Sequence, residues 1–291
     1  MAAVTILGSL IITPGVKAQQ SWRDAQQPKI AVPAQTQENM APLLEGMGSH
    51  NLKVTTNNEQ AQRYFNQGLM LHYGFNHTEA VKSFQQAQKL DPNCAMAFWG
   101  EALARGPHLN APMAASNTAP AKAAIEKAQS LAGKASAREQ AFIRALAFRY
   151  LENRTANRGE LDRLYADGMR EVAQQYPDDP DAQALFAEAL MVLSRYDYWE
   201  DDGTPNGLGE EIVTTLEKSM ERQPNHPATN HFYIHVVEMR HPKRGEAAAD
   251  RMRDLVPGIG HMQHMPSHIY LQVGRYADAS TANEKAVAAD S

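Results

Sequence analysis

The chain has 291 residues, a formal net charge of −5 and a single cysteine, Cys94. This acidic balance supplies no basic surface for a phosphate backbone, so we expect no nucleic-acid partner. One cysteine excludes an internal disulfide and a thiolate metal cluster, so any bound metal must be held by nitrogen, oxygen or thioether ligands.

The N-terminal segment predicts export. Residues 1–18 form a mostly apolar run with small residues at Val16 and Ala18, which suits cleavage of a signal peptide and predicts a periplasmic or secreted protein. The run is too short for a permanent membrane span. No basic residue precedes the apolar part, as one does in most signal peptides, and the alternative is an irregular N-terminus on a cytosolic protein.

Residues 19–57 are rich in Gln, Pro, Asn and Thr and poor in large apolar groups, which predicts a mostly disordered linker. Within this segment, residues 42–50 carry enough apolar groups to dock onto the folded part. From residue 58 to residue 291 the sequence predicts helices, and no strand pattern of any length competes. In the first two helices, which flank a turn at residues 74–76, the apolar residues recur at helical spacing at Tyr64, Phe65, Leu69 and Leu71 and at Val81, Phe84 and Leu90.

The first two helices carry the pattern of a known repeat. The small residues Gly68 and Ala80 let the two helices approach closely, and the Phe84 ring fills the next interface. Ala87 is a further small residue of the pattern, and Pro92 ends the second helix. All five positions match the spacing of the tetratricopeptide repeat (TPR), so the chain resembles proteins of this class.

Looser helix pairs follow the first one. They are residues 95–104 with 121–131, 136–150 with 159–175, 181–193 with 210–222, 227–239 with 243–255, and 260–273 with 276–290. The prediction is an all-α, TPR-like α-solenoid, a right-handed superhelix of about six antiparallel helix pairs with insertions at residues 106–120 and 196–209.

Several strings also resemble a group of exported bacterial TPR proteins whose activity is not settled. The strings are residues 48–51 (GSHN), 73–77 (YGFNH), 106–113 (GPHLNAPM), 230–235 (NHFYIH) and 264–270 (HMPSHIY). This resemblance covers most of residues 40–290 and implies the same fold, without implying an activity.

Seven of the eleven histidines fall between residues 226 and 275. Six residues there form two sets at the i, i+3/i+4, i+7 spacing of one helical face, namely His231, His235 and Glu238, and His261, His264 and His268. In a TPR array the first helix of each pair lines the concave groove. Because adjacent first helices pack about 8–10 Å apart, we expect both sets to meet there on one or two metal ions.

Imidazole ligands suit a transition metal, and copper or zinc is favoured, with iron also allowed. Met262 and Met265 beside the second set would add thioether ligands, which favour copper. Pro266 interrupts the second set, so the helix either bends there or begins there, with His261 and His264 on the preceding turn.

Other residues have functional and structural interpretations. His72 occupies an equivalent face of the first repeat, Trp99 could line a pocket or pack between repeats, and His108 and Asn110 lie in an insertion that could cover the groove or form a structural loop. The remaining histidines stand at expected helix ends, where capping or solvent exposure is the simpler fate; they are His50, His77, His226 and His241.

Three functions remain open from the sequence. The leading hypothesis is an exported TPR-like protein whose concave groove binds a transition metal, with a peptide or small molecule as a further ligand. The first alternative is a metal-free scaffold that binds a partner peptide. The second is a metal-dependent oxidoreductase or hydrolase, which predicts an enclosed pocket beneath the two insertions in place of an open groove.

Overall fold

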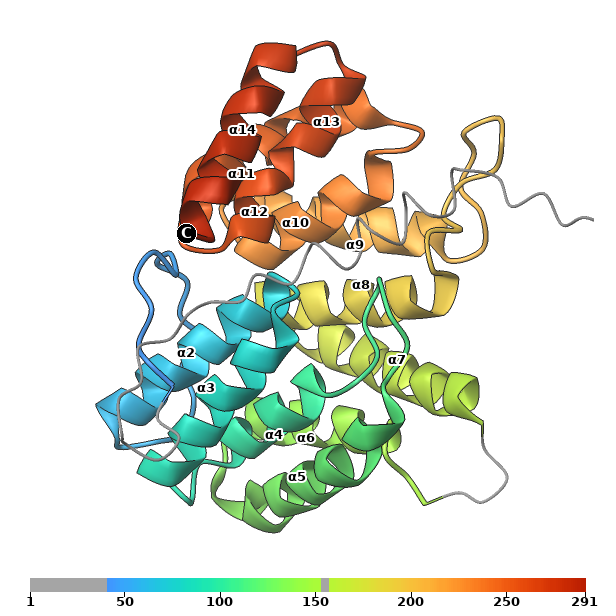
Figure 1. Cartoon of the computed structure of the whole chain (residues 1–291). Helices are drawn as coiled ribbons and strands as arrows, with labels where there is room; N and C mark the ends of the chain where they lie inside the picture. The colour runs from blue at the N-terminus through green and yellow to red at the C-terminus, as the bar shows by residue number, and fades with distance from the viewer. Residues whose placement is uncertain (1–40, 153–156) are drawn as a thin grey trace, which may run out of the picture. The chain divides into compact units, whose positions relative to one another are not determined.

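A computed structural model describes residues 41–152 and 157–291, and the predicted signal peptide and residues 19–40 lie outside this part. Within these two ranges the regular elements are helices in six antiparallel pairs, as the sequence predicted (Figure 1). The pairs are α2 (Glu59–Tyr73) with α3 (His77–Leu90), α4 (Ala95–Ala104) with α5 (Thr118–Leu131), α6 (Ala137–Phe148) with α7 (Arg158–Gln175), α8 (Pro180–Ser194) with α9 (Gly209–Arg222), α10 (Pro227–Val237) with α11 (Glu246–Leu255), and α12 (Gly260–His264) plus α13 (Pro266–Gln272) with α14 (Tyr276–Ala289).

Short 3₁₀ turns join some of the helices: η1 (Ala115–Asn117), η2 (Ala132–Lys134) and η3 (Pro242–Gly245). In the described ranges the only β-type pairs are two isolated bridges, and each falls in one of the predicted insertions. No helix of the described chain is both long enough and apolar enough to cross a bilayer.

The interface between the first two pairs depends on two glycines around one aromatic ring. Phe84 of α3 is fully buried, and its ring lies against Gly68 of α2 and Gly100 of α4. A Cβ atom added at Gly68 would stand 2.9 Å from the Phe84 ring, and one at Gly100 would stand 2.3 Å from it. These positions therefore require glycine for close packing, and the role predicted for Gly68 is confirmed.

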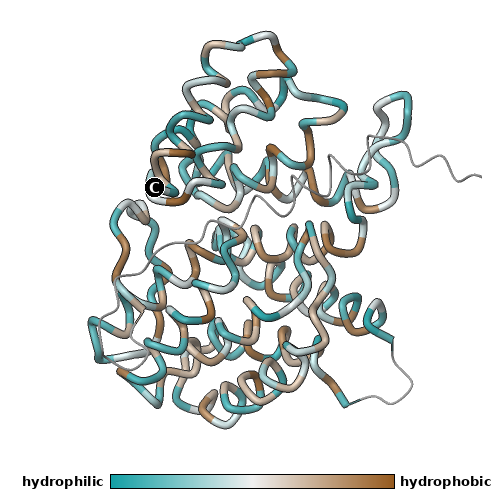
Figure 2. The backbone as a smooth tube through the Cα atoms, viewed as in Figure 1, coloured by the Kyte–Doolittle hydropathy of each residue, from teal (hydrophilic) through white to brown (hydrophobic). Residues whose placement is uncertain are grey.

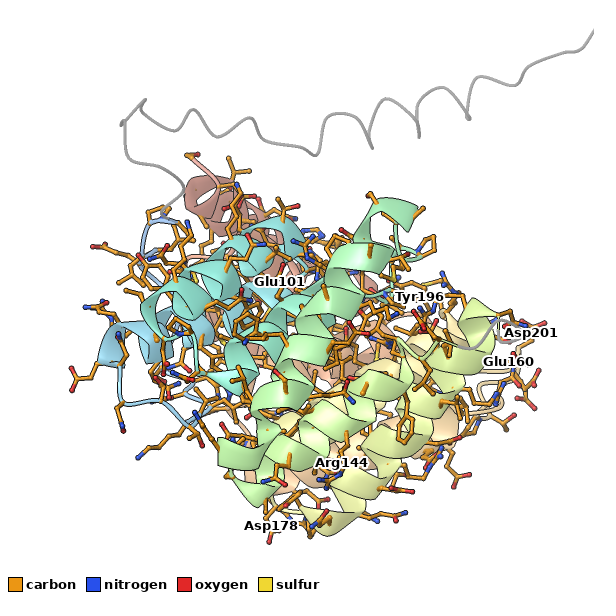
Figure 3. All side chains as sticks on the ribbon, turned by 90° about the horizontal axis from the view of Figure 1, so that it is seen from below. Glu101, Arg144, Glu160, Asp178, Tyr196 and Asp201 are labelled. Carbon is orange, nitrogen blue, oxygen red and sulfur yellow. The ribbon has the colours of Figure 1, made fainter. Side chains whose placement is uncertain are left out.

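Apolar residues recur along each helix between polar ones, and the buried ones form a continuous core between the pairs (Figure 2). Charged residues such as Arg144, Asp178 and Asp201 are exposed, whereas Glu101 is buried and paired with Arg105 at 2.8 Å (Figure 3). This partition is expected of helices that each bury one face against a neighbouring pair.

Residues 41–57 correct the linker prediction at its C-terminal end. They lack regular structure but pack on α2, with Leu52 and Val54 buried and with the Tyr64 hydroxyl donating to the carbonyl oxygen of Ala41 at 2.8 Å. Gln67 of α2 holds the same segment, because its side-chain amide donates to the carbonyl oxygen of Pro42 at 2.9 Å. Two buried apolar side chains and these hydrogen bonds offset the entropy of ordering the segment, which polar composition alone did not reveal.

Helix α10 contacts a helix from a distant part of the array. Helix α10 of the fifth pair contacts α8 and α13, as a stacked array requires, and it also contacts α2 of the first pair. Consequently the face of α10 that was expected to line an open groove is packed against the C-terminal end of α2. The candidate site is built at this contact.

Candidate metal centre

Helix α10 holds His231 and His235 one turn apart on one face, with ring centroids 4.9 Å apart. His261 and His264 belong to α12 and His268 to α13. Pro266 is the first residue of α13, where its missing N–H costs no hydrogen bond, and the preceding Met265 keeps helical backbone angles. The chain therefore breaks into two short helices at this proline, which was one of the two outcomes expected.

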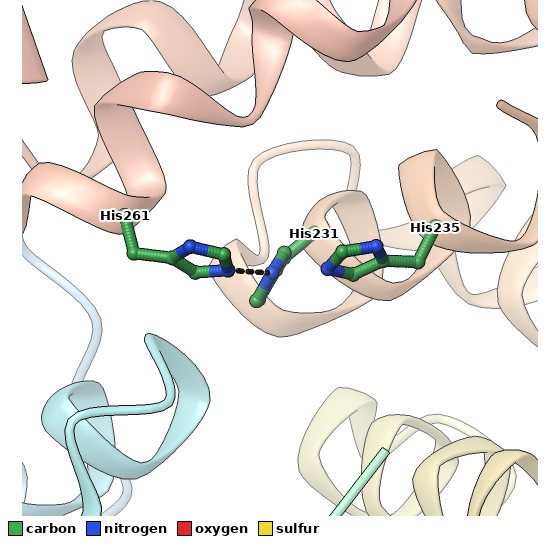
Figure 4. A group of neighbouring side chains, drawn as sticks. All are labelled: His231, His235 and His261. Carbon is green, nitrogen blue, oxygen red and sulfur yellow. Dashed lines mark hydrogen bonds between the residues drawn. The ribbon is translucent and has the colours of Figure 1, made fainter. Parts of the chain in front are cut away.

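His231, His235 and His261 bring one ring nitrogen each into a group whose members all lie within 4.8 Å of one another. The Nε2 atoms of His231 and His261 are 3.0 Å apart, and Figure 4 shows the His231 ring between the other two. Two nitrogens bound to one zinc ion at a tetrahedral angle stand about 3.4 Å apart, so this spacing is close to that of a ligand set.

In both α10 histidines the Nδ1 atom, which points away from the other rings, already makes a hydrogen bond. Nδ1 of His231 donates to the carbonyl oxygen of Tyr73 at 2.6 Å, and a carbonyl can only accept. Nδ1 of His235 donates to Oε1 of Glu238 at 3.3 Å. In a neutral imidazole the proton on Nδ1 leaves Nε2 with a free lone pair, so both rings present an unprotonated Nε2. Nε2 of His235 is buried and has no hydrogen-bond partner.

His264 and His268 repeat this arrangement beside the first three rings. Nδ1 of His268 donates to Oε2 of Glu238, and Nδ1 of His264 donates to Oδ1 of Asn283 at 2.6 Å. Their Nε2 atoms face each other at 2.9 Å. Two unprotonated nitrogens at this distance repel each other unless a proton or a cation lies between them.

Burial keeps the rings neutral. Desolvation lowers the pKa values of His231 and His261 well below the usual value for histidine, and it also lowers the pKa values of His235 and His264. Neutral imidazole is the form that binds metals, so these rings are ready to bind an ion at neutral pH.

Glu238, which the sequence predicted among the ligands, lies behind the rings. Burial by itself would raise the pKa of its carboxyl group, but the hydrogen bonds from His235 and His268 lower this pKa to about 2. Each carboxylate oxygen accepts one Nδ1–H, so Glu238 orients two of the candidate ligand rings and is ionised at neutral pH.

The α10 side of the site is buried, whereas the His268 side chain on α13 is 30% exposed. His231 is 0% exposed and His235 is 3% exposed, and the Phe75 ring lies 4.6 Å from the His231 ring between centroids. The two insertions meet beside the site, because the Tyr196 hydroxyl donates to Oδ1 of Asn110 at 2.6 Å and the Tyr196 ring contacts that of His235. The expectation of an open groove is thus wrong for His231 and His235.

The other predicted site residues lie at different distances from the candidate centre. His108 lies 5.7 Å from Phe75 between ring centroids, next to the site. His72 is buried, with Nε2 3.4 Å from Glu188, outside the group of three rings. Trp99 does not line the site: it is fully buried and donates from Nε1 to the carbonyl oxygen of Phe142, in the core between α4 and α6.

A second group, missed by the sequence reasoning, consists of His50, Asp181 and His226, whose ligand atoms also lie within 4.8 Å of one another. Oδ1 of Asp181 accepts from Nε2 of His50 at 2.9 Å, from Nε2 of His226 at 3.2 Å and from the Tyr73 hydroxyl at 2.7 Å. Nδ1 of His226 caps α10 by accepting the backbone N–H of Thr229, so the proton of this ring is on Nε2 and points at Asp181. The three hydrogen bonds that Oδ1 of Asp181 accepts make this group a hydrogen-bonded junction between the N-terminal segment, α2 and α10. His50 and His226 are far apart in the sequence, and no spacing signal links them.

The fold and the site define a helical-repeat protein with a buried histidine centre. Residues 61–94 match the model of the tetratricopeptide repeat, so the first helix pair is one such repeat. No curated protein matches the sequence.

Several solved structures are similar to this chain. A thermophilic TPR protein of Thermus thermophilus is 15% identical with a TM-score of 0.39, covering 78% of this chain and 90% of that one. The MamA RS-1 ArsTM double mutant is 9% identical with a TM-score of 0.36, covering 81% of this chain and 97% of that one. MamA MSR-1 C2 is 13% identical with a TM-score of 0.34, covering 79% of this chain and 96% of that one. These similarities are too remote to bear on function.

Proposed function

We propose that this TPR protein binds a transition-metal ion through Nε2 of His231, His235 and His261, with His264 and His268 as an adjacent pair of ligands. The supporting observation is that four of these rings use Nδ1–H in an outward hydrogen bond and turn an unprotonated Nε2 inward. Nitrogen ligands with methionine nearby favour zinc or copper, and iron is allowed.

The test is elemental analysis of protein purified without chelators and without a histidine tag. We expect bound metal in the natural chain and its loss in His231→Ala/His235→Ala. The matched control is His241→Ala, because His241 donates from Nε2 to the carbonyl oxygen of Gly203, away from the centre, and this variant retains the metal. Equal metal content in all three proteins, with helical content preserved, contradicts the proposal.

The contact between the two insertions supports a second candidate function, a metal-dependent oxidoreductase or hydrolase. The Asn110–Tyr196 hydrogen bond joins the insertions at the protein surface beside His235, which limits the access of solvent to this ring. A catalytic metal keeps an open coordination position. X-ray absorption with and without azide distinguishes the two cases, because a new metal–ligand distance supports catalysis and an unchanged spectrum supports a closed binding site.

We also infer export from residues 1–18, which lie outside the described residues. Sequencing the N-terminus of the mature protein from the periplasm or culture medium tests this inference, and intact residues 1–18 on a cytoplasmic protein would contradict it.

The TPR fold itself suggests binding of a protein or peptide. His231 and His235 are buried and inaccessible to an extended peptide, so a peptide partner must contact other residues of the array. This function is tested separately, by comparing partner binding before and after chelation.

A further inference from the structure

The string at residues 48–51 (GSHN), which the candidate centre does not use, lies in the N-terminal segment that packs on the array. Close backbone contact holds this string against the end of α11. A Cβ atom added at Gly48 would stand 2.3 Å from the carbonyl oxygen of Leu255, and the φ of +73° at Gly48 is one that other residues rarely adopt. The position therefore requires glycine, and the tight contact fixes where His50 enters the fold.

His50 meets Asp181 and His226 in the hydrogen-bonded junction, and the donors crowd one oxygen atom. Oδ1 of Asp181 accepts from Nε2 of His50 at 2.9 Å, from Nε2 of His226 at 3.2 Å and from the Tyr73 hydroxyl at 2.7 Å. A carboxylate oxygen has two lone pairs, so three donors exceed what one oxygen accepts with good geometry. A cation in place of the two imidazole protons would relieve this crowding.

The three side chains also have the spacing of a ligand set. Their ligand atoms all lie within 4.8 Å of one another, and the rings of His50 and His226 have centroids 4.5 Å apart. Two ligands at right angles on an ion with bonds of about 2.1 Å stand about 3.0 Å apart. The distances of 2.9 and 3.2 Å from Oδ1 of Asp181 to the two Nε2 atoms are close to this value.

A cavity of about 330 Å³ opens beside the junction. Both imidazoles line it, together with Ser49, Leu255 and the end of α9 with the turn into α10, and none of its lining residues is acidic. The His50 side chain is 15% exposed, whereas those of Asp181 and His226 are 4% and 1% exposed. An ion held by the three side chains is therefore reached from the cavity, and any coordination position that they leave open faces it.

Binding an ion requires an unprotonated Nε2 on both rings, so the proton of each neutral imidazole must move to Nδ1. At His226 this move gives up the hydrogen bond from the backbone N–H of Thr229, which is long at 3.3 Å. The Thr229 hydroxyl still donates to the carbonyl oxygen of His226 at 3.1 Å. The loss is one weak hydrogen bond, which is small beside the binding free energy of a metal with three protein ligands.

We propose that His50, Asp181 and His226 form an open site for a divalent transition-metal ion. Two histidines and one carboxylate on one face of an ion, with the other positions free, are the ligand set that favours ferrous iron. Nε2 of each imidazole and Oδ1 of Asp181 are the ligand atoms, and the free positions take water or a small molecule from the cavity. The site shares no ligand with the five-histidine centre and does not depend on it.

The first experiment measures ferrous iron on the full chain. Chelator-treated protein is loaded with Fe(II) without oxygen, desalted and analysed for iron per chain. The variant is His50→Gln, because the glutamine amide still donates to Asp181 and preserves the junction, but it does not replace imidazole as a ligand. We expect this variant to lose about one iron relative to the natural chain, whereas His241→Ala loses none.

The second experiment tests the open position. Nitric oxide is added to iron-loaded His231→Ala/His235→Ala protein, which lacks two ligands of the other centre. We expect the electron paramagnetic resonance signal of an Fe(II)–nitrosyl complex, and we expect its loss when His50→Gln is added to that protein. Bound iron that gives no nitrosyl signal contradicts the open position.

Unchanged iron content in a folded His50→Gln protein overturns the site. Loss of iron in His50→Gln, with none lost in His231→Ala/His235→Ala, supports the site and contradicts the function proposed above, and the reverse pattern supports that function and overturns the site. If circular dichroism shows that His50→Gln is unfolded, Asp181→Asn decides, because it keeps the size of the side chain and removes the charged ligand. Iron retained in Asp181→Asn overturns the proposal, and iron lost supports it.

Discussion

Substituting Glu238 by glutamine tests how the histidine centre is held together. The carboxylate now accepts two hydrogen bonds, from Nδ1 of His235 at 3.3 Å and from Nδ1 of His268. Glutamine has nearly the same shape, but one of its two terminal atoms is an NH₂ donor. That donor faces an Nδ1–H, so one ring must turn away or move its proton to Nε2, where it blocks metal binding.

We expect Glu238→Gln to lose as much zinc affinity as the removal of a residue that orients a ligand usually costs. Removing an outer partner of a ligating histidine weakens metal binding about 10–100-fold, which corresponds to about 1.4–2.7 kcal/mol. The assay is competition for zinc against a chelator of known affinity at pH 7. Glu217→Gln is a matched control, because Glu217 also accepts from two donors, Tyr233 and Arg244, and contacts none of the candidate ligands.

Equal zinc affinity in Glu238→Gln and the natural chain would refute the reasoning. A loss as large as that of His235→Ala would also refute it in part, because Glu238 would then be a direct ligand and not an orienting group.

Two further substitutions test the scaffold. Asp181→Asn should destabilise the metal-free protein by about 1–3 kcal/mol at pH 7, since one carboxylate oxygen accepts three hydrogen bonds, two of them buried. Burial would raise the pKa of Asp181, but its hydrogen bonds with His226 and His50 lower it below the usual value, so this stability is present above about pH 4 and is lost as pH falls. Urea midpoints of the natural chain and the variant should therefore converge as the pH is lowered below 4, and a constant difference would contradict this. Gly100→Ala should cost about 1–3 kcal/mol, because the new Cβ would stand 2.3 Å from the Phe84 ring. Gly133→Ala is its control, with nothing within 4 Å of the new Cβ; equal urea midpoints for the two alanine variants would contradict the packing argument.

The fold was predictable because its signals are local. Helical periodicity, the glycine and alanine positions around Phe84 and the prolines after the helices all act within one repeat. The pairing of neighbours then follows from the order of the chain. The same locality placed His231 and His235 on one face, since a helix fixes the relation of residues four apart. Pro266 was recognised as a break for the same reason.

What only the tertiary structure decided depends on contacts between distant parts of the chain. Residues 41–57 have a linker composition, yet they pack on α2 because their few apolar groups find a complementary surface there. His77 was expected at a helix end, capping it or facing solvent; it begins α3, but both of its ring nitrogens are buried where its ring meets that of His108. The junction at Asp181 joins donors from α2, α10 and the N-terminal segment, which no spacing relates.

The sequence by itself therefore determined the repeat architecture and the residues able to bind a metal, because these follow from periodicity and side-chain chemistry. The contact of α10 with α2 decided that His231 and His235 are buried and do not line an open groove. The hydrogen bonds that Tyr73 and Glu238 accept decided which nitrogen of each α10 ring faces inward. The orientation of these rings depends on groups that come together only on folding, so it cannot be predicted from residue spacing along the chain.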